Sequence, residues 1–122
     1  MRHLFMFLVA FPLWNFAQTF NGGGGLILDL QTIDIPLTVS GLSPSTIDST
    51  SFGLETVCIN LTHTWDADMD ISLVAPDGTF ASLSSANGGS GDNYTNTCFN
   101  TGAALLISFG NPPFTGTFKP DG

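Results

Sequence analysis

Residues 63–79 read HTWDADMDISLVAPDGT, and this stretch carries the strongest structural signal in the chain. Within it, Ile71–Ala75 has apolar side chains at its first, third and fifth positions, the two-residue period of a half-buried β-strand. Pro76-Asp77-Gly78 predicts a tight turn, because proline presets φ and glycine accepts a positive φ. Thr79–Leu83 then returns as the partner strand, so the stretch predicts a β-hairpin.

Further strands are predicted on both sides of this hairpin. Val57–Thr62 alternates apolar and polar side chains, and Asn96–Asn100 and the apolar run Ala103–Phe109 indicate two more strands. The sequence NGGSGDN at 87–93 cannot hold regular structure and predicts a loop. Outside the N-terminal apolar run, no segment shows helical periodicity with caps. Strands about ten residues apart predict an all-β fold, a jelly-roll-like β-sandwich.

The N-terminus has the pattern of a targeting segment. Arg2 and His3 precede the apolar run Leu4–Trp14, which is shorter than the roughly 20 residues of a membrane span but suits the core of a signal peptide. With cleavage after Ala17, residues 1–17 are the predicted signal peptide. We expect a protein that is secreted or on the cell surface, with no membrane span after cleavage. The alternative is an uncleaved membrane anchor or a buried strand.

The segment after the predicted cleavage site is expected to add little to the fold. Residues 18–36 form a flexible leader that contains four consecutive glycines. Leu26–Leu30 and Ile33–Val39 are predicted as short edge strands. The domain itself is expected to span residues 37–122.

Charge and cysteine content narrow the function. The 122 residues include ten acidic and two basic ones, Arg2 and Lys119, for a net charge of −8 at pH 7. Such a chain cannot neutralise phosphates, which excludes a nucleic-acid partner. An acidic surface suits an extracellular protein or one that binds hard cations. Secretion also predicts a disulfide between Cys58 and Cys98, the alternative being two reduced, buried cysteines.

Residues 63–79 resemble the signature of the P domain, or Homo B domain, of subtilisin-like proprotein convertases. In that signature a strand ends in His-Thr, a turn leads into Asp-x-Asp-Ile, and Pro-x-Gly-Thr closes a hairpin. Residues 87–97 and 113–122 resemble further motifs of bacterial, secreted P domains. The resemblance runs from about Val39 to the last residue and stops where similar domains continue into more strands. It therefore implies a sandwich that is incomplete at its C-terminal end and only marginally stable alone.

The resemblance implies a non-catalytic accessory domain that stabilises a subtilisin-like serine endopeptidase and so takes part in proteolysis. The expected partner is a subtilisin-like catalytic domain or another domain of the same polypeptide. No catalytic activity is expected of this chain, whereas the resemblance associates the full-length protein with serine-type endopeptidase activity. The position directly behind a signal peptide favours the alternative, a free-standing bacterial cell-surface module for adhesion or for carbohydrate or protein binding.

No catalytic residues are predicted. A Ser-His-Asp triad needs a histidine base, and outside the signal segment the chain has only His63, for which we expect a structural hydrogen bond at a strand end. Gly89-Ser90-Gly91 is no nucleophile elbow, because Asp92 stands where the closing glycine belongs. One histidine and two distant cysteines also make no zinc cluster.

Calcium is the one cofactor for which the sequence supplies ligands. The aspartates of the run DADMD copy the first three ligand spacings of an EF-hand, but Ile71 stands where that loop needs glycine, so an EF-hand is excluded. A calcium site built from loops is expected to use Asp68, Asp70, Asp92 and Asn93. The alternative is that these carboxylates are simply solvated in turns.

Overall fold

The computed structural model describes residues 17–48, 50 and 53–122, so the predicted signal peptide lies outside the described residues except for Ala17. The chain divides between Ser45 and Thr46 into two compact units, which are described separately below. No helix in the described part of the chain is long and apolar enough to cross a membrane.

The first unit forms no strand in its described residues, 17–45. The edge strands predicted at 26–30 and 33–39 are therefore absent. A strand needs a ladder of hydrogen bonds to a partner, whereas this unit shows a turn, in which the Gln31 N–H donates to the Leu28 carbonyl (3.3 Å). Its exposed apolar side chains are Leu26, Leu28, Leu30, Ile35, Leu37 and Val39.

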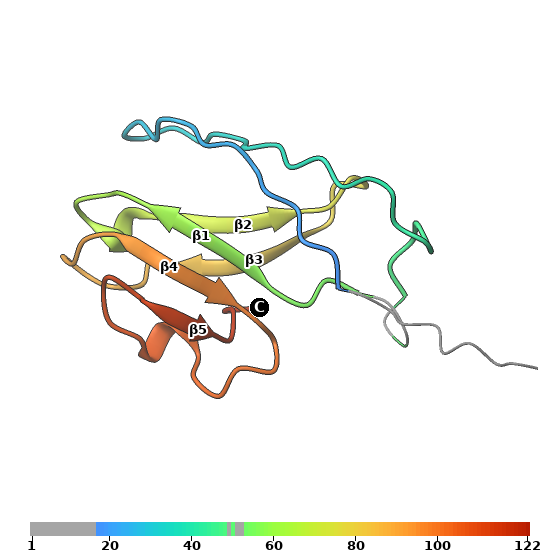
Figure 1. The fold of residues 1–122 in the computed structure, drawn as a ribbon. Helices are drawn as coiled ribbons and strands as arrows, with labels where there is room; N and C mark the ends of the chain where they lie inside the picture. Colours follow the sequence, from blue (N-terminus) through green and yellow to red (C-terminus); the bar gives the residue numbers. More distant parts are fainter. Residues whose placement is uncertain (1–16, 49, 51–52) are drawn as a thin grey trace, which may run out of the picture. The chain divides into compact units, whose positions relative to one another are not determined.

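The second unit, from Thr46 to the C-terminus, contains a three-stranded sheet (Figure 1). Its central strand is β4 (Tyr94–Phe99), flanked by β1 (Val57–Leu61) and β5 (Gly116–Phe118). β1 runs antiparallel to β4, and β5 runs parallel to β4. Both predicted strands, β1 and β4, are confirmed.

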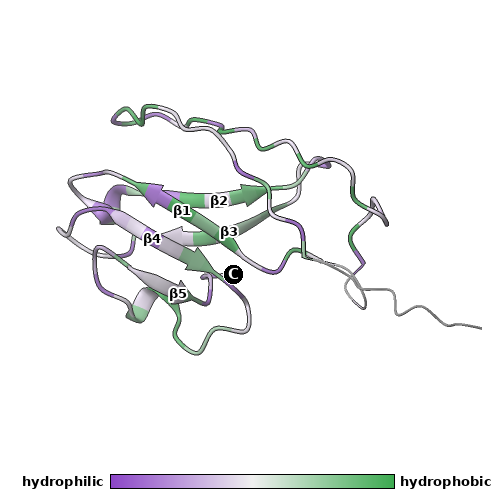
Figure 2. Ribbon diagram, viewed as in Figure 1, coloured by the Kyte–Doolittle hydropathy of each residue, from purple (hydrophilic) through white to green (hydrophobic). Residues whose placement is uncertain are grey.

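A two-stranded sheet is the predicted hairpin, formed by β2 (Asp70–Val74) and β3 (Phe80–Ser85). A single 3-10 turn, η1 (Asp66–Asp68), leads into β2. At the hairpin turn the Gly78 N–H donates to the Ala75 carbonyl (2.9 Å), and Gly78 has the positive φ, 88°, that glycine accepts. Figure 2 shows hydrophobic and polar residues alternating along β2.

The segment 103–109 was predicted as a strand, and the structure shows instead a 3-10 turn, η2 (Ile107–Phe109). This segment pairs with the chain only through an isolated bridge between Leu106 and Lys119. The place beside β4 that a longer strand would need is taken by β5. β5 was not predicted, because three residues are too few to show a two-residue period.

The core of the second unit lies between the inner faces of the two sheets. Tyr94 of β4 stacks on Phe114 with ring centroids 4.7 Å apart, and Phe118 of β5 meets Phe114 edge-on at 6.2 Å. Aromatic pairs in these geometries add to the free energy gained from burial. The buried hydrophobic side chains are Met69, Leu83, Tyr94, Phe99, Ile107, Phe114 and Phe118.

The described residues thus form an all-β fold of five strands in two small sheets, without an α-helix. This arrangement is consistent with the predicted β-sandwich. The C-terminal residues run beside the hairpin, where the Ser82 N–H donates to the Gly122 carbonyl (2.7 Å) and the Gly122 N–H to the Ser82 carbonyl (3.2 Å).

Candidate functional site

A disulfide joins strands β1 and β4 of the larger sheet. Cys58 of β1 lies directly opposite Cys98 of β4, and the two residues are bonded with their Cα atoms 4.0 Å apart. The cysteines belong to the outer face, because Cys58 is exposed while its neighbours Val57 and Ile59 turn inward and are half-buried. The predicted pairing is confirmed.

The loop at residues 87–93, named here the glycine loop, closes over the η1 turn. The backbone N–H of Asp66 donates to the carbonyl of Gly91 (2.9 Å), and that of Ala67 donates to the carbonyl of Gly89 (3.1 Å). These two bonds satisfy N–H groups at the start of the 3-10 turn, which a short turn cannot satisfy itself. The glycine loop and η1 therefore form one structural unit.

His63 connects the end of the glycine loop to the segment before η1 through hydrogen bonds of its backbone and its ring. Its N–H donates to Oδ1 of Asn93 (3.1 Å), and the Asn93 N–H donates back to its carbonyl (3.1 Å). The ring Nδ1 lies 2.9 Å from the Trp65 carbonyl oxygen and accepts the Trp65 N–H at 3.2 Å. His63 thus makes the structural hydrogen bonds that the sequence led us to expect.

Asp66 is the unusual residue of this region. It is 0% exposed, and neither Oδ1 nor Oδ2 has a hydrogen-bond partner among the described residues. Burial raises the pKa of Asp66, the nearby backbone N–H of Asn93 lowers it, the charge of Asp92 raises it and His63 lowers it. The sequence did not single out Asp66 as the buried member of its run, because alternation cannot assign burial in a turn.

The four residues predicted to bind calcium do not all lie together. Asp68 and Asp92 are exposed, and Asn93 uses Oδ1 to accept the His63 N–H. Asp70 turns to β3, where its Oδ1 accepts the hydroxyl of Ser85 (2.6 Å). Within the described residues no group of three or more His, Cys, Asp or Glu side chains is placed to hold a metal ion. Any calcium site must therefore draw on backbone or amide oxygens.

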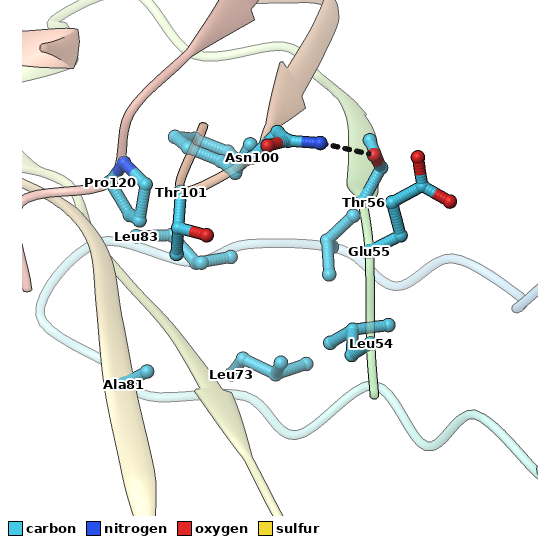
Figure 3. A pocket seen from close by; sticks show the side chains of 11 residues that line it. Leu54, Glu55, Thr56, Leu73, Ala81, Leu83, Asn100, Thr101 and Pro120 are labelled. Atoms are coloured by element: carbon cyan, nitrogen blue, oxygen red, sulfur yellow. Dashed lines mark hydrogen bonds between the residues drawn. The ribbon is translucent and has the colours of Figure 1, made fainter. Parts of the chain in front are cut away.

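An apolar hollow opens between the two sheets (Figure 3). Leu73, Ala81 and Leu83 of the hairpin line one side, and Val57 and Phe99 line the other. Its volume of about 120 Å³ is well below the roughly 300–1,000 Å³ of sites for small organic ligands. The hollow is therefore a packing gap rather than a ligand pocket.

A comparison with known protein families finds a match to this part of the chain. Residues 55–109, which hold β1 to β4 and both 3-10 turns, match the family described as Proprotein convertase P-domain. This segment is therefore similar to P domains. The match contains the stretch 63–79, the glycine loop and the disulfide, which also organise the fold of the second unit.

The chain also has a curated relative. The chain is 38% identical over 65 residues to Leupeptin-inactivating enzyme 1 of Streptomyces exfoliatus. That alignment covers 53% of this chain and 14% of the relative, so the chain spans a small part of the relative's length. No solved structure matches the chain significantly.

Proposed function

We propose that this chain is a non-catalytic accessory domain of a secreted protein, which stabilises a subtilisin-like serine endopeptidase domain of the same polypeptide. The observation that carries the proposal is the match of residues 55–109 to the P-domain family of proprotein convertases. The stabilising role, the protease partner and the extracellular location are parts of the proposal. A disulfide on the outer face of the sheet supports an oxidising, extracellular location.

An exposed apolar pair supports a role that involves packing against another domain. Val74 at the end of β2 lies opposite Phe80 at the start of β3, and their side chains are 60% and 74% exposed. Contiguous exposed apolar groups on a folded surface often mark an interface. A catalytic domain packed on this end of the hairpin would remove both side chains from water and gain the corresponding free energy.

Deletion of the domain tests the proposal. The polypeptide of the complete reading frame is prepared with and without residues 54–122, and peptide hydrolysis that is sensitive to a serine-directed inhibitor is followed at raised temperature. We expect the deletion to shorten the half-life of the activity several-fold. Phe80→Ser should shorten it in the same direction, whereas Phe109→Ser, another exposed aromatic position, should not.

Two results would contradict the proposal. One is the absence of serine-type hydrolysis from the full polypeptide, and the other is an unchanged half-life after deletion. Binding of the domain to glycans or to a cell surface, together with either result, would favour the free-standing surface module instead.

A further inference from the structure

Asp66 is a buried carboxylate that the chain compensates only in part, because the Asn93 N–H and His63 favour its charged form while burial and Asp92 oppose it. Both of its oxygens are enclosed and lack a hydrogen-bond partner in the described part of the chain. Native proteins contain few such groups, because a carboxylate removed from water must be paired, protonated or bound to a cation. A bound cation would allow Asp66 to keep its charge in this buried position.

The chain has almost no positive charge with which to pair Asp66. Its two basic residues are Arg2, which lies outside the described residues, and Lys119. The backbone of Lys119 pairs with Leu105 and Ile107, in the segment around η2. Because Asp92 adds a second negative charge next to Asp66, the local excess of negative charge is larger still.

The glycine loop packs directly against Asp66 and the backbone of the η1 turn. The carbonyls of Gly89 and Gly91 already face the η1 turn, where they accept the N–H groups of Ala67 and Asp66. At Gly88 the backbone approaches so closely that an added Cβ would lie 2.9 Å from Cβ of Asp66. A carbonyl oxygen has two lone pairs, so these groups keep acceptor capacity.

We propose that Asp66 and Asp92, together with carbonyl oxygens of the glycine loop, bind one calcium ion. Calcium takes six to eight oxygen ligands from carboxylates, backbone and amide carbonyls and water, in flexible geometry. Magnesium demands a stricter octahedron and keeps its water, which an enclosed carboxylate does not favour. Asn93 lies at the end of the same loop and its side-chain oxygen can join the set, whereas Asp70 is held by Ser85.

Calcium titration of the full 122-residue chain tests the site. Chelator-treated protein is titrated with calcium chloride by calorimetry, and thermal unfolding is recorded with chelator and at about 10 mM calcium, which saturates extracellular sites. We expect one calcium ion per chain and an unfolding midpoint several degrees higher in calcium. Fluorescence of Trp65, which precedes the site and is half-exposed, should change over the same range.

Matched variants locate the ion. Asp66→Asn should abolish the heat of binding and the rise in midpoint, without lowering the midpoint in chelator, since the amide carries no buried charge. Asp92→Asn should weaken calcium binding at least tenfold, while Asp70→Asn should bind like the unaltered chain. The proposal is overturned if about 10 mM calcium gives neither heat nor a shift, if magnesium acts equally well, or if Asp66→Asn keeps the response.

Discussion

Two neighbouring glycines of the glycine loop both have positive φ but differ in their surroundings. Gly88 has a φ of 92°, and a Cβ added there would lie 2.9 Å from Cβ of Asp66 and from Cε2 of Phe114. Gly89 has a φ of 58°, and nothing lies within 4 Å of a Cβ added there. At position 88, both the lack of space for a side chain and the positive φ require glycine. At position 89, only the positive φ favours glycine.

Gly88→Ala should consequently cost much more stability than Gly89→Ala. We expect Gly88→Ala to lower the free energy of unfolding by about 2–4 kcal/mol, from overpacking and backbone strain, and Gly89→Ala by about 1 kcal/mol, from strain alone. Chemical denaturation of both variants measures the difference. Equal losses would show that the glycine loop yields easily at Gly88.

Asp77 gives the hairpin turn a dependence on pH. Its Oδ1 accepts the hydroxyl and the N–H of Thr79 at 2.7 and 2.9 Å, and these bonds, the hydroxyl first, lower the pKa of Asp77 below 3.8. A lowered folded-state pKa means that this stabilisation is present above pH 3.8 and is lost as pH falls through the folded value.

Asp77→Ala should therefore lower the unfolding midpoint at pH 7, and the gap to the unaltered chain should narrow toward about pH 2.5. Thermal unfolding at the two pH values measures it. Asp34→Ala, which removes a carboxylate from the first unit, is the control and should show no such narrowing. A gap of constant size would mean that the Asp77 charge contributes nothing.

Strands β1 and β4 are joined covalently by the disulfide between Cys58 and Cys98. The disulfide joins residues 40 positions apart and so restricts a long stretch of the unfolded chain. The stretch that it closes contains the hairpin, η1 and the glycine loop. Loss of the bond therefore lets the unfolded chain gain entropy without changing the contacts of the folded strands.

The double variant Cys58→Ala/Cys98→Ala should lose about 3–4 kcal/mol of unfolding free energy, a large share of the roughly 5–15 kcal/mol of a typical domain. Denaturant unfolding with and without reductant measures this loss. Reductant should destabilise the unaltered chain by a similar amount and leave the double variant unchanged. A double variant as stable as the oxidised chain would contradict the prediction.

Strands whose sequence alternates between apolar and polar residues could be predicted. Elements whose structure depends on pairing with a distant strand could not. β1 to β4 were predicted because alternate side chains face opposite sides of a strand, so burial of one face leaves a pattern in the sequence. β5 exists because residues 116–118 lie beside β4, and three residues carry no such pattern. The run 103–109 is apolar because Ile107 enters the core from a 3-10 turn, which apolarity alone does not distinguish from a strand.

In the second unit, the packing of the two sheets leaves an apolar hollow between them. The hollow of about 120 Å³ between them is lined mainly by apolar groups, and Ala81, which is itself exposed, is one of the residues that line it (Figure 3). A larger apolar side chain at this position would bury more surface without removing any hydrogen bond of the β2–β3 ladder.

Ala81→Leu should accordingly raise the free energy of unfolding by about 1 kcal/mol, because each added methylene that leaves water is favourable. Ala75→Leu is the matched control. Ala75 directly follows β2 and is exposed like Ala81, but it does not line the hollow, so that change should stay within about 0.5 kcal/mol. A loss of stability at Ala81 would show that the hollow is too rigid to accept more volume.

Local patterns in the chain were enough to predict the hairpin, the glycine loop, two strands of the larger sheet and the cysteine pair. Periodicity and turn chemistry act over a few residues, and with two cysteines only one intramolecular pairing exists. The burial of Asp66, the bond between Asp70 and Ser85 and the parallel position of β5 depend on contacts between segments far apart in the chain. Such contacts leave no local pattern, because burial and charge compensation belong to the packed structure rather than to any single segment.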